Sequence, residues 1–75
     1  MLVFDRGEYR TWLKFFKYSQ KDVVEILNVR YGIRLNEQGL SNIDNGRQAW
    51  RIDVAIGIAD IFDIPVEQLF YFIKK

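Results

Sequence analysis

Two stretches of the chain carry apolar side chains at intervals of three and four residues, the spacing of a stripe along one side of an α-helix. In the first stretch, over about residues 8–17, these side chains are Tyr9, Trp12, Leu13 and Phe16. In the second stretch they are Val54, Ala55, Ile58, Ile61 and Phe62. Gly57 lies inside the second stretch at a cost of about 1 kcal/mol relative to alanine. We therefore expect Gly57 to permit close packing of another helix.

Capping residues predict two further helices in the middle of the chain. Ser19 precedes Asp22 by three residues, as in a capping box. The buried side of the helix that follows would carry Val23, Val24, Ile26 and Leu27. Gly32 is expected to end this helix as a left-handed C-cap. Asn36 predicts the N-cap of the next helix, which ends before Gly46.

A fifth helix is predicted to begin at Pro65, because proline suits a first helical turn and Glu67 suits the positive end of the helix dipole. Lys74 and Lys75 would suit its C-terminal end. This helix would carry four consecutive apolar residues, Phe70, Tyr71, Phe72 and Ile73. One small core cannot bury all four, so we expect them to form an association surface. Tyr71 and Phe72 would face outward, and Ile73 would share the buried side with Leu69.

The helix that begins after Asn36 has a polar outer side. Leu40 and Ile43, three residues apart, are expected to be buried. The opposite side carries Gln38, Ser41, Asn42 and Asn45. Glutamine and asparagine can pair with adenine through two hydrogen bonds in the major groove of DNA. The pattern therefore indicates a DNA-reading helix.

Three segments resemble, in the same order, the Cro/C1-type (XRE) helix-turn-helix family of phage and bacterial repressors. The run LSNIDNG at residues 40–46 is similar to the family segment I/L-S-x-I-E-x-G. Upstream, SQKDVVEIL at residues 19–27 looks like S-Q-x-x-L-A-x-x-L, and downstream, IADIFDIPVEQLF at residues 58–70 is similar to I-A-x-x-L-G-V-x-x-x-x-L-F. The resemblance implies an all-α fold, a five-helix lambda-repressor-like helix-turn-helix domain.

The chain departs from the family pattern at two places. About six additional residues, Arg30 to Leu35, enlarge the turn between the second and third helices. Arg30 and Arg34 in this turn are either solvated surface charges or contacts to DNA phosphates, and the sequence leaves both open. Trp50 lies where the family commonly has a proline, and a place in the core is favoured for it over a ligand platform.

The resemblance also implies roles for single residues. Glu37, Gln38 and Asn42 would face DNA bases. The residues facing phosphates would be Gln20, Asn45 and Arg47. For Glu37 we favour the alternative that an acid in the first turn stabilises the helix dipole. For Asn42 the alternative is an ordinary exposed helix position.

Composition narrows the classes of function. The 75 residues are 49% hydrophobic, which predicts a single domain over residues 1–75. The chain has no cysteine and no histidine, so we expect no thiolate or histidine metal site and no enzyme activity, and neither a cofactor nor a small-molecule ligand is evident. The sequence has no apolar run long enough for a signal or a membrane span. A cytoplasmic protein without membrane association is expected.

Charge leaves two functions open. The net charge of +1 is small for a DNA-binding protein. Residues 1–52 hold nine Lys/Arg against six Asp/Glu, whereas residues 53–75 hold two against four, so the positive charge lies with the predicted reading unit. A split of this size also arises by chance in a short chain.

The first of the two functions is a sequence-specific, double-stranded-DNA-binding transcriptional regulator of a phage or mobile element. It would bind its operator as a homodimer, on half-sites about 34 Å apart. The alternative is an antirepressor or antitoxin-type protein-interaction module on the same scaffold, which would bind a second regulator protein. Low net charge, Glu37 at a reading position and the aromatic C-terminal segment favour that alternative.

Overall fold

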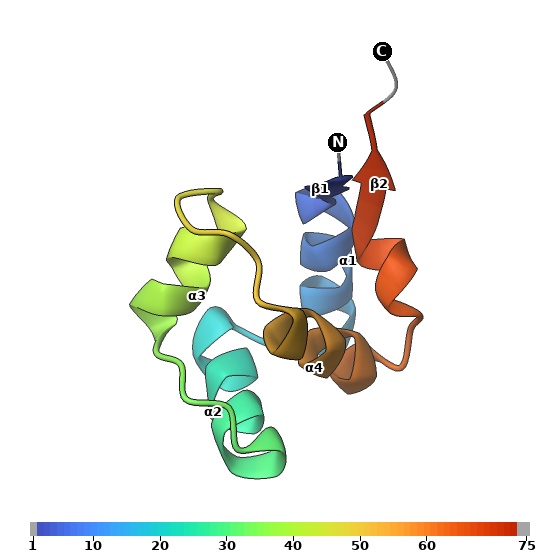
Figure 1. The fold of residues 1–75 in the computed structure, drawn as a ribbon. Helices are drawn as coiled ribbons and strands as arrows, with labels where there is room; N and C mark the ends of the chain where they lie inside the picture. Colours follow the sequence, from blue (N-terminus) through green and yellow to red (C-terminus); the bar gives the residue numbers. More distant parts are fainter. Residues whose placement is uncertain (1, 74–75) are drawn as a thin grey trace.

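Four α-helices and a small antiparallel sheet form the part of the chain that the computed structural model describes, residues 2–73. The helices are α1 (Arg6–Phe16), α2 (Gln20–Tyr31), α3 (Glu37–Asp44) and α4 (Ile52–Phe62), and a 3₁₀ turn, η1 (Val66–Leu69), follows them. The strands β1 (Leu2–Phe4) and β2 (Phe70–Phe72) pair at the two ends of the described chain (Figure 1). None of the helices in this range is long and apolar enough to cross a membrane.

The predicted helix caps in the middle of the chain are confirmed. Ser19 and Asp22 form a capping box at the start of α2. Gly32 ends α2 with a left-handed φ of 65°, a conformation that glycine adopts without a Cβ clash. The side chain of Asn36 accepts a hydrogen bond of 2.7 Å from the backbone N–H of Gly39. These caps set the bounds of α2 and α3.

The core lies between the four helices, β1 and η1. The five stripe residues predicted for α4 are all buried, and Leu27 of α2 and Leu69 of η1 have no exposed area. On α1 only Tyr9 is fully buried, while Trp12, Leu13 and Phe16 are half-buried at the edge of the core. The predicted apolar stripes therefore face one common core.

The predicted fifth helix is wrong. After Pro65 the chain makes only the 3₁₀ turn η1 and then becomes extended, with φ −137° and ψ 151° at Phe70. Aromatic side chains favour strands. In the observed register, Phe70 pairs with Phe4 and Phe72 with Leu2. The fold is therefore mostly helical with a two-stranded sheet, neither all-α nor five-helical.

The strand also changes how the apolar C-terminal residues are placed. Tyr71 and Phe72 are exposed, as expected, but Ile73 is exposed too, at 47%. The prediction that Ile73 shares a buried side with Leu69 is wrong, because Leu69 ends the turn η1 and Ile73 follows the strand β2, so the two residues do not lie on one α-helix. Lys74 and Lys75, expected at the end of that helix, lie outside the described residues.

Trp50 belongs to the core, as favoured from the sequence. It is half-buried, and its ring centroid lies 4.0 Å from that of Phe4 and 5.7 Å from that of Phe70. Trp50 thereby joins the segment before α4 to both strands. This aromatic contact between strand and loop is made by the residue that lies where the family that the sequence resembles commonly has a proline.

Candidate nucleic-acid interface

Both ends of the short helix α3 are held by hydrogen bonds to the residues next to it in the chain. Asn36 caps its N-terminus, and its last turn continues into Gly46, which has a left-handed φ of 77°. Beyond this glycine the chain folds back, and the backbone N–H groups of Arg47 and Gln48 donate to the carbonyl oxygen of Asn42 over 2.8 and 3.2 Å. The loop after α3 is thus fixed to its final turn, so the arginine in this loop lies beside the helix.

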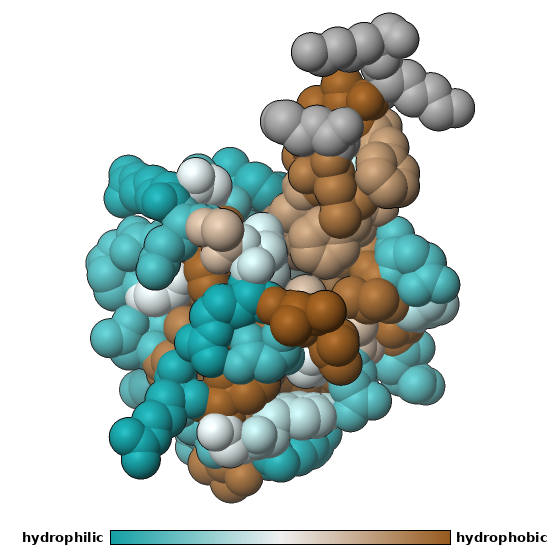
Figure 2. All heavy atoms as spheres, viewed as in Figure 1, coloured by the Kyte–Doolittle hydropathy of each residue, from teal (hydrophilic) through white to brown (hydrophobic). Residues whose placement is uncertain are grey.

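One side of α3 is buried and the other is polar, as predicted. Leu40 is 0% exposed and Ile43 is 2% exposed. Gln38 and Asn45 are exposed, and Ser41 and Asn42 are half-buried on the outward side. Figure 2 shows mainly hydrophilic side chains over α3, whereas hydrophobic ones gather over the strand pair. The two sides of the molecule therefore present different chemistry.

The two predicted adenine-reading residues hydrogen-bond to each other. The side-chain amide nitrogen of Gln38 donates to the carbonyl oxygen of Asn42 over 2.9 Å. This bond leaves the oxygen of Gln38 as an acceptor and the amide nitrogen of Asn42 as a donor. Adenine presents one donor and one acceptor in the major groove, so the pair offers a complementary set that is already oriented.

Glu37 is exposed at the first position of α3. With Asn36 and with Lys21 and Glu25 of α2, it lines a hollow of about 640 Å³ between the two helices. An acid in a first helical turn stabilises the helix dipole, which is the role favoured from the sequence. Its position on the outward rim also leaves the carboxylate accessible to a partner.

The C-terminal end of α3 is tied to α1 by an arginine that the sequence did not single out. Arg6 donates from its guanidinium to the side-chain oxygen of Asn45 over 3.0 Å, and its Nε lies 3.5 Å from a carboxylate oxygen of Asp44. Asn45 in turn donates to Ser41 over 3.2 Å. Asn45, predicted as a phosphate contact, is therefore held between two neighbours, and Arg6 adds a cation beside it.

Asp44 is a buried carboxylate at this junction, with 7% of its side chain exposed. Arg6 and Arg10 lie on its two oxygens, at 3.5 and 3.9 Å. Oδ1 of Asp44 has no hydrogen-bond partner among the described residues. The two arginines therefore compensate a buried charge and hold the start of α1 against the end of α3.

Gln20 begins α2 and binds a buried tyrosine. The hydroxyl of Tyr9 donates to the side-chain oxygen of Gln20. Burial is the main reason that the pKa of Tyr9 is raised, so its hydroxyl stays a donor. Because Tyr9 uses the oxygen of Gln20, the amide nitrogen of Gln20 remains to donate, which is what a phosphate contact requires.

The enlarged turn is fixed by Asn28, another residue that sequence reasoning missed. Its side chain donates to the carbonyl oxygens of Val24 and Leu35 over 2.9 and 3.1 Å, and accepts from the backbone N–H of Leu35 over 3.4 Å. An amide side chain directly after Leu27 was the only signal for this role. These hydrogen bonds hold the segment that precedes α3 against the C-terminal part of α2.

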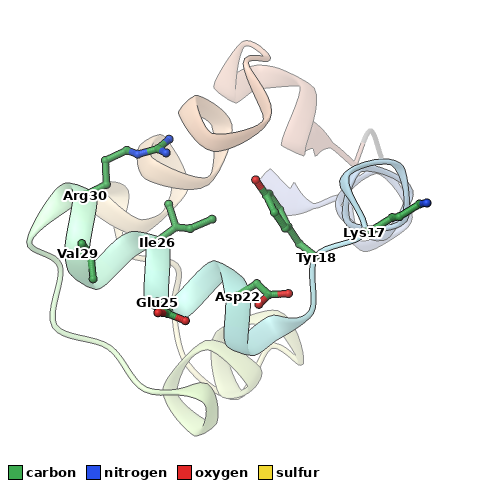
Figure 3. Close-up of a pocket in the computed structure, with 7 residues that line it drawn as sticks. All are labelled: Lys17, Tyr18, Asp22, Glu25, Ile26, Val29 and Arg30. Carbon is green, nitrogen blue, oxygen red and sulfur yellow. The ribbon is translucent and has the colours of Figure 1, made fainter.

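Arg30 lies in the last turn of α2, whereas Arg34 lies in the loop after α2, and the two arginines line different hollows. Arg34 is exposed and lines a hollow of about 410 Å³ with Gly39 of α3 and Gln48 of the following loop. Arg30 lies about 200° around α2 from Asn28. It points into a different hollow, of about 450 Å³, together with Tyr18 and Ile26 (Figure 3).

The structure therefore brings only some of the predicted phosphate contacts together. Arg34 lies near the N-terminal end of α3, and Asn45 and Arg47 lie at its C-terminal end. No residue of α3 lines the hollow that holds Arg30. Among the described residues, the side chains of Arg34 and Arg47 form no hydrogen bond or ion pair that would compete with a phosphate. Comparisons of the chain with protein-family models, with curated proteins and with solved structures give no match.

Proposed function

We propose that this chain is a sequence-specific, double-stranded-DNA-binding transcriptional regulator whose α2 and α3 act as a lambda-repressor-like helix-turn-helix. α3 would lie in the major groove and the N-terminal end of α2 would cross the backbone. The observation that carries the proposal is the hydrogen-bonded pair of Gln38 and Asn42 on the outward side of α3. A pair of outward-facing amides with one free acceptor and one free donor is well suited to read a base edge.

The flanking groups support the same orientation. Arg34 lies just before the N-terminal end of α3, and Arg6 and Arg47 lie at its C-terminal end, so cations are present at both ends of the helix. Gln20, at the start of α2, retains an amide donor for a phosphate. Contacts of this kind fix the register of a protein on DNA, while base contacts provide the specificity.

The test begins with selection of bound duplexes from a random pool, followed by titration of the selected and a scrambled duplex at several salt concentrations. Gln38→Ala and Asn42→Ala should each lower affinity for the selected duplex by about 1–3 kcal/mol and leave the scrambled duplex nearly unaffected. Equal losses on both duplexes would assign the two residues a positioning role. No enrichment and no salt-dependent binding by the unmodified chain would contradict the proposal itself.

The second candidate function is an antirepressor or antitoxin-type module that binds another regulator protein. Glu37, an exposed acid on the outward rim of α3, favours it, because an acid repels phosphates. The small net charge of +1 also favours it. Glu37→Gln separates the two functions, since it should strengthen binding to DNA in general if α3 meets DNA and should weaken binding to a basic protein surface if α3 meets a protein.

A further inference from the structure

The apolar side of the strand pair continues past the core onto the surface. Phe4 and Phe70 form one cross-strand pair, and Phe4 is buried. The next pair on the same side is Leu2 with Phe72, because residues two apart in a strand share a side. Leu2 and Phe72 are 55% and 71% exposed. Both line a groove in the region where hydrophobic side chains gather (Figure 2).

The groove has the size and the lining of a small-molecule site. It measures about 440 Å³ and lies between the strand pair, η1 and α4. Ile52 and Ile56 line it from one side of α4, and both are exposed. Sites for small ligands measure about 300–1,000 Å³ and are lined mainly by apolar and aromatic side chains, with a few polar groups that fix the orientation of the ligand. The groove therefore suits a compact ligand with an apolar body.

Aromatic rings make up part of the lining. They are those of Trp50, Phe70 and Phe72. The ring centroids of Trp50 and Phe70 lie 5.7 Å apart, and the two rings are nearly perpendicular, at 86°. The face of an aromatic ring is electronegative, so it attracts a cation that lies within about 6 Å of it, and tryptophan does so most strongly. The rings therefore favour a positively charged ligand over a negatively charged one.

The charged residues of the groove favour the same ligand. Arg51 and Glu67 are the two that line it. The guanidinium of Arg51 donates two hydrogen bonds to the carboxylate of Asp53, over 3.1 and 2.7 Å, so its charge is already compensated. Glu67 is exposed, and its carboxylate forms no ion pair among the described residues. The unpaired charge of the groove is therefore negative.

We propose that this groove binds a lipophilic organic cation, an ammonium group on an apolar chain or ring. The apolar body contacts Ile52, Ile56 and Phe72, and the ammonium group lies beside the carboxylate of Glu67 and the aromatic rings. No residue of α3 lines the groove, so this site is separate from the proposed DNA-reading surface. The proposal does not depend on DNA binding.

Two probes of opposite charge test the electrostatic part, by titration without DNA and detection of chemical-shift changes in NMR spectra. Phenylbutylammonium and phenylpentanoate share a phenyl ring and a butylene chain, and they differ in the charged group at its end. The ammonium should bind more tightly than the carboxylate. Glu67→Gln should raise the dissociation constant of the ammonium about two- to fivefold, the value of an exposed ion pair, and should not weaken binding of the carboxylate.

Glu25→Gln is the matched control for charge, because Glu25 is also exposed but does not line the groove. It removes the same charge from the protein and should leave the affinity for both probes unchanged. A general effect of net charge would appear equally in both variants, whereas a local contact appears in Glu67→Gln alone.

The apolar part is tested with the same two probes. The double variant Ile52→Gln/Phe72→Gln should weaken the binding of both probes about tenfold, because it removes two apolar side chains from the contact. Phe15→Gln/Val29→Gln is the control, since these side chains are 72% and 82% exposed but do not line the groove. Circular dichroism should show both double variants folded, because every substituted side chain is exposed.

Three results would overturn the proposal. One is that phenylbutylammonium binds no more tightly than phenylpentanoate. Another is that Glu67→Gln changes the affinity for the ammonium no more than Glu25→Gln does. The third is a dimer of the unmodified chain, seen by sedimentation velocity, that Ile52→Gln/Phe72→Gln dissociates, since a second copy would then occupy the groove. None of these measurements contains DNA, so failure of the proposed DNA-binding function leaves their interpretation unchanged.

Discussion

Gly57 of α4 lies directly against Leu27 of α2: a Cβ atom added to Gly57 would come within 2.7 Å of Cδ2 of Leu27. Leu27 has no exposed area, so its side chain has no free space into which it can move. The absence of a side chain at position 57 thereby sets how closely α2 and α4 approach. Because α2 also contacts α3, the distance between α2 and α4 also affects the position of the helix that supports the proposed reading helix.

Gly57→Ala should therefore destabilise the protein, although alanine is the better helix former by about 1 kcal/mol. Overpacking of a dense core costs about 1–3 kcal/mol, which outweighs that gain. Gly7→Ala is the control, because a Cβ at Gly7 meets nothing closer than a side-chain oxygen of Asp5 at 3.5 Å. Urea unfolding should show a loss for the first variant and no loss for the second. A more stable Gly57→Ala protein would contradict the tight contact.

Arg6→Ala should destabilise the fold by about 1–3 kcal/mol, because it leaves the buried carboxylate of Asp44 with Arg10 alone, at 3.9 Å. The loss is kept moderate because the Arg6 side chain is 46% exposed, and water screens the pair. In an Asp44→Asn background the same change should cost clearly less. A double-mutant cycle from thermal or urea unfolding measures this difference, and strictly additive losses would mean that the two residues do not interact.

Arg34→Ala and Arg47→Ala should each reduce the slope of log K against log salt for DNA binding by about 0.9, the value for one lost phosphate contact. Arg30→Ala should leave the slope unchanged, because Arg30 lines the hollow that no residue of α3 joins. The three variants remove the same charge and so control for the net charge of the protein. Equal changes in all three slopes would show a long-range charge effect in place of local phosphate contacts.

The capping box at the start of α2 should give the protein a defined acid sensitivity. The backbone N–H of Ser19, followed by its hydroxyl, donates to the carboxylate of Asp22 and holds the pKa of Asp22 below its ordinary value of 3.8. A lowered pKa means that the carboxylate contributes its full stability above pH 3.8 and loses it as the pH falls through the lowered value. Asp22→Asn should therefore flatten the fall in unfolding free energy in this acidic range. An unchanged acid profile would exclude the box as a source of pH dependence.

The parts of the fold that the sequence predicts correctly are those fixed by near neighbours. Ser19 with Asp22 is joined over three residues, and so is Asn36 with Gly39. Gly32 ends α2 through its own backbone conformation. Such contacts need no information from distant parts of the chain, so the bounds of α2 and α3 follow from local chemistry.

The parts that the sequence does not predict depend on distant partners. Phe70–Phe72 becomes a strand because Leu2–Phe4 pairs with it from the other end of the chain. The C-terminal apolar run alone does not indicate that this partner strand exists. The contact of Arg6 with Asn45 spans 39 positions. Arg30 and Arg34 are four residues apart, and the same two interpretations applied to both in the sequence. In the fold, Arg30 lies in the last turn of α2 and Arg34 in the loop that follows, so they line different hollows.

The pairing of β1 with β2 also has a consequence for the order in which the chain folds. The entropy lost on closing a loop grows with its length, and the loop between Leu2 and Phe72 contains nearly the whole chain. Helices and their local caps should form first, and the strand pair should form last. Until then, Phe70–Phe72 remains an unpaired aromatic segment with strong strand propensity, open to pairing with another unfinished molecule. The segment that closes the fold is therefore the main aggregation hazard of the refolding chain.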